Sequence, residues 1–425
     1  MTLRVDRHWL AIRGNGLNTI WLDLSLAYRN IVRQRRRSAV AIGAISFGIT
    51  ALIVASGFIE WIFMDFREST INAQLGHLQI VKPGYHDSGK ADPYAFLLPN
   101  EVPQLGDAGN AGTIKVVAPR LSFSGLISHG DATLSFIGEG VEPDAEAAFG
   151  NGLQISSGSN LVADDRKSVI VGEGLARNLG VTVGDTVVLL ANTATGGTNA
   201  VELSVRGLFS TVTKAYDDAA LRIPIETART LLRSNGSHVW IVLLNKTADT
   251  DRVMASLQAR LGNQGMEVVP WYQLAEFYNK TAQLFTKQIQ GIKLIIAMII
   301  LLSISNTMTM TVIERIGEIG TAMALGVRRS GILRMFLSEG LLLGCFGGLV
   351  GVLTGVGMAA LISSIGVPMP APPGMAHGYI GEVLVTPRIA VEALLLAIAT
   401  TVLASIYPAW KASRQAIVDA LRFNR

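Results

Sequence analysis

The sequence predicts an integral membrane protein with four transmembrane α-helices and a large α+β extracytoplasmic domain inserted between the first and second helices. Composition is the first observation, because the chain of 425 residues is 49% hydrophobic and 16% charged, whereas soluble domains carry about 25% charged residues. The second is that four apolar stretches each exceed the roughly 20 residues that a helix needs to cross a bilayer. The third is that the segment between the first two stretches consists of short β-rich runs separated by turns.

These stretches divide the chain into nine segments. In order, they are a cytoplasmic N-terminus with an interfacial amphipathic helix (1–37), the first span (38–63), the extracytoplasmic α+β domain with stalk helices (64–285), the second span (286–313), a short cytoplasmic helix (314–330), the third span (331–366), a short extracytoplasmic loop (367–387), the fourth span (388–410) and a cytoplasmic tail (411–425). In the third span, Gly344 with Gly348 and Gly351 with Gly355 have a small-xxx-small spacing, which predicts close packing within the chain.

Lysine and arginine gather on one side of the predicted membrane. The loop between the third and fourth spans has neither residue before Arg388. The other short flanks are basic, with Arg29, Arg33, Arg35, Arg36, Arg37, Arg315, Arg328, Arg329, Arg334, Lys411, Arg414, Arg422 and Arg425. Because cytoplasmic flanks are enriched in lysine and arginine, both termini are predicted to be cytoplasmic. The formal charge of +4 therefore reflects orientation in the membrane and does not indicate nucleic-acid binding.

The segment before the first span is predicted to form an amphipathic helix. Its apolar residues recur at helical spacing and include Trp21 and Tyr28, and arginines follow. This combination is typical of a helix that lies in the membrane interface. An ordinary amphipathic helix that packs against a partner protein is the alternative.

The extracytoplasmic segment is predicted to have two lobes carried on two stalk helices. The runs that predict strands are "HLQIVK", "TIKVVAPRLSFSGLIS", "ATLSFIGEGV", "SVIVGEG", "DTVVLLAN", "AVELSVRGLFS" and "HVWIVLLN". Helices are predicted for "LARNLGV", "ETARTLLRSN" and "RVMASLQARLG". Acidic residues stand beside glycines in "GEGVEP" and "VGEGLA", which is typical of tight turns at strand ends. The order of the strands does not follow from these runs.

No enzyme motif is found in the sequence. It contains no Gx4GK[ST] phosphate-binding loop, no HExxH zinc motif and no G-x-S-x-G nucleophile elbow. The six histidines form no close ligand pair, and the single cysteine, Cys345, lies in an apolar run where it packs as a small apolar residue. The chain is therefore predicted to carry no catalytic residues, no metal site and no cofactor.

A charged segment with several glycines, "VIERIGEIGTAMALGVRRSGIL", joins the second span to the third. It is predicted to form a short helix that ends at Gly326, with Ile316, Ile319, Gly320 and Met323 on one face. An apolar centre with charges at its rim allows such a helix to dock a soluble partner. A solvated connector is the alternative, but a connector has little need of glycines, which permit close approach of another backbone.

The stretch "IERIGEIGTAMALGVRRSGILRMFLSEGLLLGCFGGLVGVLTG" resembles the permease segment of the MacB/FtsX/LolC–LolE superfamily, the type VII ABC transporters. In that superfamily, the pattern E-R-x-x-E-I-G-x-x-x-A-x-G forms the coupling helix that seats in the ATPase. "LAYRNIVRQRRRSAV" and "YPAWKASRQAIVDALR" resemble the family's entry into its first span and its C-terminal end, although Ile417 stands where many members have proline. "GHLQIVKPGY" and "PMPAPPGM" resemble the lipoprotein-releasing branch. The resemblance assigns ATPase coupling to Glu314, Arg315, Glu318, Ile319, Gly320, Ala324 and Gly326.

The resemblance implies a permease subunit in the inner (plasma) membrane of a bacterium, with ATP and Mg bound by a separate ABC ATPase in two copies. Closure of the ATPase would be transmitted through the coupling helix and stalk to the outer domain, which acts on a lipoprotein or another amphipathic substrate. A macrolide- or peptide-type exporter and an FtsX-like regulator of cell-wall hydrolases are the alternatives, and a membrane-tethered enzyme is disfavoured by the missing motifs. The other implied partners are a second permease, either a copy or a homologue, a periplasmic carrier or adaptor protein, and membrane lipid.

If acyl chains are handled, the outer halves of the first two spans are expected to hold them. Apolar side chains can bind an acyl chain because each buried methylene contributes about 0.8 kcal/mol. Contact of the same faces with ordinary lipid or a neighbouring permease is an equal alternative. The substrate-binding candidates are Phe58 and Ile62, with Ala55 and Ile59, on the first span and Ile292 and Ile296, with Phe285 and Ile289, on the second span and its lead-in.

Overall fold

The computed structural model describes residues 16–89, 92–103, 112–150, 153–211, 213–370 and 378–415. The chain forms two compact units. The helical unit comprises Met1–Ile62, Gln283–Val367 and Ile380–Arg425, and the α/β unit comprises Phe63–Ala282 and Pro368–Tyr379. The C-terminal departure at Ile417 and most of the proline-rich loop lie outside the described residues.

Six helices give residues to the helical unit. They are α1 (Gly16–Arg33), α2 (Arg35–Thr70), α10 (Glu276–Glu314), α11 (Ile316–Ala324), α12 (Arg329–Ile365) and α13 (Pro387–Ser413). In the described part of the chain, α2, α10, α12 and α13 are long and apolar enough to cross a membrane, which confirms the prediction of four spans. Both α2 and α10 also give residues to the α/β unit.

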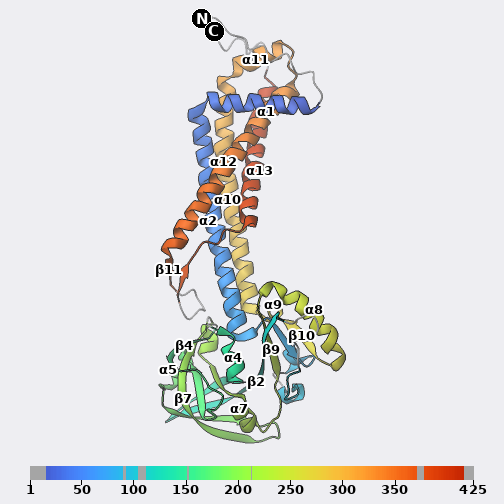
Figure 1. Ribbon diagram of the computed structural model, residues 1–425. Helices are drawn as coiled ribbons and strands as arrows, with labels where there is room; N and C mark the ends of the chain where they lie inside the picture. The colour runs from blue at the N-terminus through green and yellow to red at the C-terminus, as the bar shows by residue number, and fades with distance from the viewer. Residues whose placement is uncertain are drawn as a thin grey trace. The chain divides into compact units, whose positions relative to one another are not determined.

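Glycines on α12 allow two neighbouring helices to pack closely against it (Figure 1). A Cβ atom at Gly347, Gly351 or Gly355 would lie within 3.0 Å of a β-branched isoleucine of α2. A second row, Gly344 and Gly348 among them, faces α13 in the same way. The intramolecular packing predicted from the small-xxx-small spacing is therefore confirmed, and hydrogen bonds such as that from the hydroxyl of Ser46 to the carbonyl of Gly347 (2.9 Å) accompany it.

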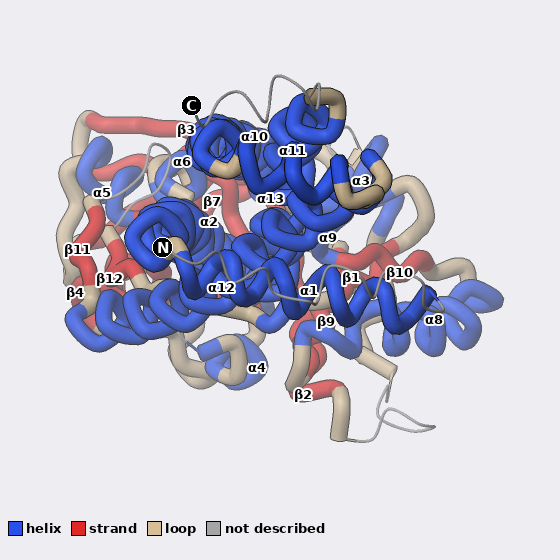
Figure 2. The backbone as a smooth tube through the Cα atoms, turned by 90° about the horizontal axis from the view of Figure 1, so that it is seen from above, coloured by secondary structure: helices blue, strands red, loops and turns tan. Residues whose placement is uncertain are grey.

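Helix α1 crosses the long helices of the helical unit and lies beside α12 (Figure 1, Figure 2). Asp23 pairs with Arg334 of α12 at 3.3 Å, and Ile31 is buried in the core shared with α2. Trp21 and Tyr28 are exposed, at 75% and 53% of their surface. One side of α1 thus packs in the protein, and Trp21 and Tyr28 remain exposed. An exposed side of this kind is required by both predictions for this helix, which are a place in the membrane interface and contact with a partner protein.

The α/β unit is built on a ten-stranded sheet in the order β10-β1-β9-β2-β3-β8-β5-β7-β4, with β6 pairing with β2 and β7. The pairs β3–β8 and β5–β7 are parallel, and the other pairs are antiparallel. The strands are β1 (Leu78–Val81), β2 (Ile114–His129), β3 (Ala132–Val141), β4 (Gln154–Gly158), β5 (Ser168–Gly172), β6 (Thr186–Asn192), β7 (Thr198–Ser210), β8 (Ala220–Pro224), β9 (Val239–Leu244) and β10 (Glu267–Pro270).

Strand β2 is long enough to take part in two separate apolar cores. Its first half pairs with β9, and its second half pairs with β3 and β6. One core includes Trp240 and Leu257, and the other includes Phe136 and Leu231. The helices that complete the α/β unit are α3 (Tyr85–Ser88), α4 (Pro143–Ala147), α5 (Glu173–Leu179), α6 (Lys214–Asp217), α7 (Ile225–Leu232), α8 (Thr250–Leu261) and α9 (Trp271–Leu274). A two-stranded sheet pairs β11 (Val367–Met369) with β12 (Tyr379–Gly381).

Candidate functional site

Helix α11 forms a separate short helix between two long ones. The chain leaves α10 at Glu314, turns at Arg315 and forms α11 from Ile316 to Ala324. Gly326 then adopts a positive φ of 95°, a conformation that glycine accepts without strain and that stops the helix. The predicted short helix is present, and it ends at Ala324, two residues before the predicted end at Gly326.

The apolar face of α11 packs against the chain's own helices. Ile319 and Met323 are buried in a cluster with Phe336 of α12 and Ala409 of α13. Gly320 is also buried, whereas Ala324 and Gly326 are exposed. The apolar face that was expected to meet a partner is therefore covered by α12 and α13 of the same chain. Burial of so apolar a face against neighbouring helices is favourable because it removes the face from water.

The two carboxylates of the coupling motif pair with arginines near the start of the chain. Glu318 lies 3.3 Å from Arg33, at the end of α1, and Glu314 pairs with Arg37, at the start of α2. All four side chains are at least one-third exposed. Exposed ion pairs contribute about 0–1 kcal/mol each, so these contacts orient α11 but are readily exchanged.

Arg315, by contrast, is a buried member of the coupling motif. Its Nε donates to Glu318 Oε2 at 3.1 Å, and its Nη2 donates to Asn30 Oδ1 at 3.2 Å. Its Nη1 lies 3.9 Å from Glu339, a buried carboxylate of α12. The guanidinium of Arg315 therefore connects α1, α11 and α12. Its positive charge also stabilises the buried carboxylate of Glu339.

An exposed apolar residue directly after α11 was not predicted from the sequence. Leu325 is 60% exposed and follows the helix directly. Arg328 and Arg329, the next basic residues, are exposed as well. An apolar side chain flanked by charges has the composition of a small docking surface. Its sequence signal is weak, since Leu325 occupies a variable position of the coupling motif.

A buried cluster of two arginines and two glutamates lies in the α/β unit. Arg120 (β2) donates from Nε and Nη2 to the carboxylate of Glu146 (α4) at 2.7 and 2.9 Å. Arg222 (β8) donates from Nε to Glu139 (β3) at 2.9 Å, opposite it in the strand register. The two arginine side chains are only 2% and 4% exposed. These four residues, hereafter the helix-end clamp, neutralise one another inside the protein.

The helix-end clamp also holds the end of the first long helix. Helix α2 continues without a break into a π-helical turn, η2 (Ile71–Leu75). Arg120 Nη1 donates to the carbonyl oxygen of Gln74 at 2.6 Å, and Arg222 Nη2 donates to that of Ala73 at 2.9 Å. The last carbonyls of a helix lack intrahelical partners and carry partial negative charge. Two buried cations therefore fix this helix end to strands β2 and β8.

The charges of the clamp persist despite their burial. Burial raises the pKa of Glu139, but Arg222 and then Arg120 outweigh it, so that the pKa lies below its usual value. The turn interpretation of "GEGVEP" is wrong for Glu139, which lies inside β3 and is paired with Arg222 across the sheet. Sequence gave no signal for this pairing, because the two residues are far apart in the chain.

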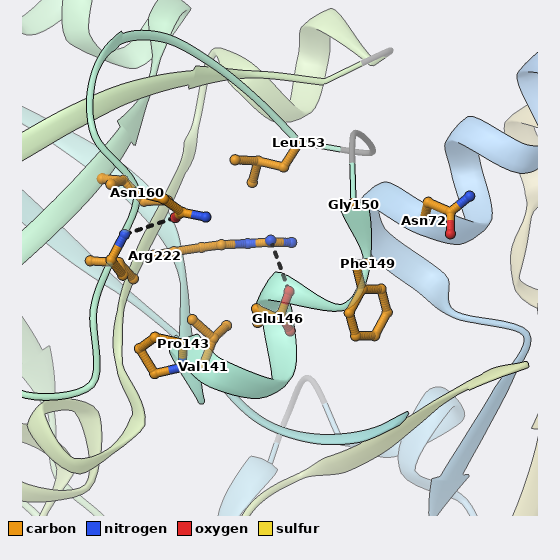
Figure 3. Close-up of a pocket in the computed structure, with 11 residues that line it drawn as sticks. Asn72, Val141, Pro143, Glu146, Phe149, Gly150, Leu153, Asn160 and Arg222 are labelled. Carbon is orange, nitrogen blue, oxygen red and sulfur yellow. Dashed lines mark hydrogen bonds and ion pairs between the residues drawn. The ribbon is translucent and has the colours of Figure 1, made fainter. Parts of the chain in front are cut away.

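A small cavity of about 30 Å³ lies beside the clamp (Figure 3). In Figure 3, the guanidinium of Arg222 reaches Glu146, and Asn72 extends from the π-helical turn. A cavity of this size holds about two water molecules. The cavity is therefore far too small for an acyl chain or a drug molecule.

The substrate-binding candidates are all half-buried. Ile296 packs against Gly48 of α2, where a Cβ atom would lie 3.3 Å from its side chain. The ring of Phe58 covers Gly381, 2.7 Å from the position of a Cβ atom. Ile62 and Ile292 keep part of their surface accessible. Ile296 and Phe58 thus contact their own chain, and each candidate has some surface left for another molecule.

Two family models match this chain. The one described as the MacB-like periplasmic core domain matches residues 38–260, more than half of the chain, and the one described as the FtsX-like permease C-terminal matches residues 292–417. The chain belongs to the MacB/FtsX/LolC superfamily of ABC transporter permeases. The superfamily inferred from the coupling motif is thereby confirmed, and the break between the two matches contains β10, α9 and the first part of α10.

Relatives from both branches of the superfamily are similar to this chain. The lipoprotein-releasing system transmembrane protein LolC of Xylella fastidiosa is 24% identical over 435 residues, which cover 95% of this chain and 99% of that protein. The macrolide export ATP-binding/permease protein MacB of Hyphomonas neptunium is 30% identical over 212 residues, 48% of this chain and 30% of that protein. An uncharacterized ABC transporter permease of Methanocaldococcus jannaschii is 26% identical over 223 residues, 51% of this chain and 54% of that protein. The matches thus span about half or less of the last two relatives.

Proposed function

We propose that this chain is the membrane subunit of an ABC machine in a bacterial inner membrane, with both termini in the cytoplasm, and that it passes the movement of a separate ATPase to the α/β unit on the outer face. Its substrate is a lipoprotein or another amphipathic molecule. The ATPase binds ATP and Mg and docks on α11. A second permease and a periplasmic carrier complete the assembly.

The observation that carries this proposal is the construction of α11. Its apolar side packs against α12 and α13, and the buried Arg315 links it to α1 and α12, so that α11 is expected to move together with the spans. A push on its exposed tip at Leu325 would therefore reach the long helices directly. This arrangement is better suited to transmitting movement from α11 to the long helices than a flexible connector would be.

The helix-end clamp supports the second half of the proposal. A moving helix transmits force only if its far end is fixed to what it moves. Two buried arginines make six hydrogen bonds that join the end of α2, through Ala73 and Gln74, to the sheet and to α4. Because these hydrogen bonds connect the end of α2 directly to β2 and β8, a displacement of α2 would move both strands.

The lipoprotein substrate is proposed in preference to a macrolide because a LolC protein is similar to this chain over 99% of its own length, whereas a MacB protein that is similar over 99% of this chain matches over only 64% of its own length. An exporter of the macrolide type is the second candidate, favoured by the match of the MacB-like core domain to residues 38–260. Mass spectrometry of what co-purifies with the chain in a mild detergent separates the two. Acylated protein bound to the wild type and lost during ATP turnover supports lipoprotein release, and an ATPase partner with no acylated cargo supports the exporter.

A further inference from the structure

Helix α10 has two opposite apolar faces, of which only one is covered. Ile300, Ile304 and Met308 are buried, and Ile300 packs against Gly48 of α2. The other face extends over more than four turns and is exposed except at the half-buried Thr309. Its residues follow one another at intervals of four and three. They are Ile295, Ile299, Leu302, Asn306, Thr309 and Ile313. Intervals of four and three alternating over several turns are those of a helix that packs along a second helix as a left-handed pair.

Asn306 is the feature that ordinary lipid cannot accommodate on this face. It lies well inside the candidate span formed by α10, and its side chain is exposed. Within the described residues, its amide makes no hydrogen bond. The neighbouring threonines behave differently, since Thr307 and Thr309 each donate to a carbonyl of α10 four residues earlier. An unpaired amide in hydrocarbon is strongly unfavourable, so a protein surface is expected to cover Asn306.

The amide also indicates which protein covers it. An asparagine carries both a donor and an acceptor, so two copies of Asn306 related by a twofold axis satisfy each other. A twofold axis along the membrane normal brings the same face of each copy together, residue for residue. A single asparagine at such a core position is known to fix the register of paired helices. A different chain would need its own polar residue at the same depth.

We propose that this face of α10 pairs with the same face of α10 in a second copy of the chain, with Asn306 hydrogen-bonded to Asn306 across the twofold axis. The proposal deepens the proposed function and rests on it in one respect: it identifies the second permease as a copy of this chain. Ile299, Leu302 and Ile313 flank the asparagine pair and exclude lipid from it.

Cysteine cross-linking in native membranes tests this pairing. The only native cysteine, Cys345, is first replaced by serine. Asn306→Cys and Leu302→Cys are then compared with Leu294→Cys. Leu294 is as exposed as Leu302 but lies about 120° around the helix from Asn306 and about 80° from Leu302. Leu353→Cys on α12, also exposed, is a second control. Two copies with different affinity tags are expressed together, so that a disulfide between them is recognised by both tags.

The expected result is a disulfide between tagged copies at positions 306 and 302, about tenfold or more above both controls, because pairing raises the local thiol concentration to the millimolar range. Linkage at Leu294 or Leu353 equal to that at Asn306, or a disulfide from position 306 to a different polypeptide, would overturn the proposal. Asn306→Gln should retain pairing better than Asn306→Leu when dissociation in detergent is measured. Equal dissociation of the two variants argues against the asparagine bond.

The same membranes distinguish failure of this proposal from failure of the proposed function. Recovery of a bound ABC ATPase with the tagged chain is measured in parallel. Linkage at position 306 without any ATPase would leave the pairing standing and reject the proposed function. Recovery of an ATPase without linkage at 306 would do the reverse.

Discussion

The helical unit and the α/β unit both depend on arginine–glutamate pairs, but they use them in opposite ways. Around α11, Glu314 and Glu318 meet Arg37 and Arg33 at the surface, where the pairs are weak and water can replace either partner. In the helix-end clamp, Arg120 and Arg222 are almost fully buried, and each bonds both a carboxylate and a helix carbonyl. The surface pairs are therefore suited to exchange with a partner, whereas the clamp is suited to hold a helix end in place.

The largest expected effect comes from breaking the clamp. Arg120→Met leaves Glu146 buried without its bidentate partner and should destabilise the α/β unit by about 3–5 kcal/mol. Denaturant unfolding of the full chain in detergent, followed by tryptophan fluorescence, measures the loss. Arg206→Met is the matched control, because Arg206 makes a half-exposed pair with Asp165 and should cost less than about 1 kcal/mol. Similar losses in the two variants would mean that the clamp is no stronger than a surface pair.

A second test uses acid, to which the α/β unit should be sensitive. Burial lowers the pKa of His77 and of His238 to about 4, and the Nδ1 atom of each accepts a backbone hydrogen bond, from Leu244 and Ser122. In the unfolded chain these two histidines take up protons below about pH 6.5, whereas in the folded chain they do so only near pH 4. Their contribution to the free energy of unfolding is therefore present above pH 6.5 and is lost as the pH falls. Between pH 6.5 and pH 5, protonation of each histidine in the unfolded chain should lower the free energy of unfolding by about 2 kcal/mol.

Hydrogen exchange at the amides of Leu244 and Ser122 follows this loss in the full chain, after correction for the intrinsic effect of pH. The variants His77→Asn and His238→Asn keep an acceptor near the Nδ1 position but cannot be protonated. They should show a flatter pH dependence than the wild type. An unchanged profile in both variants would place the acid sensitivity elsewhere.

The docking surface at the end of α11 is expected to give a moderate effect. Leu325→Asp places a charge where an apolar contact is proposed and should weaken ATPase binding by about 2 kcal/mol, roughly 30-fold in Kd. Binding of the purified ATPase to the chain in nanodiscs measures it. Val183→Asp, at an exposed apolar residue of the α/β unit, should bind as the wild type does. Wild-type affinity for Leu325→Asp would remove this residue from the interface.

The smallest effect is expected for the exposed pair of Glu314 and Arg37. Reversing one charge should cost less than about 1 kcal/mol, and exchanging both, as Arg37→Glu with Glu314→Arg, should restore the wild-type rate of stimulated ATP hydrolysis if the two residues act on each other. The alternative is that Glu314 acts on a basic group of the ATPase. In that case the exchange leaves the rate as low as Glu314→Arg alone, which decides whether this pair belongs to the permease or to its partner.

Local patterns identified much of this molecule from the sequence. The four spans follow from the length and apolarity of single segments, and α11 stops just before Gly326, where one glycine accepts a positive φ. The alternation in "ATLSFIGEGV" matches β3 from end to end. In the ten-stranded sheet, strands β4, β8 and β10 were missed, because β4 is polar and exposed, β8 is buried on both sides without alternation, and β10 is short and ends in a proline. Each success rests on a property that a segment has by itself.

Only the tertiary structure decided which segments meet. The sequence determined that α11 has an apolar face, but only packing showed that α12 and α13 fill it. It determined that α12 has glycine rows, but the choice of α2 and α13 as neighbours came from the fold. The helix-end clamp joins Arg120 and Arg222, about a hundred residues apart, to a helix end that precedes both. Strand order and register bring such residues together, and these are set by the sum of many long-range contacts that no local pattern contains.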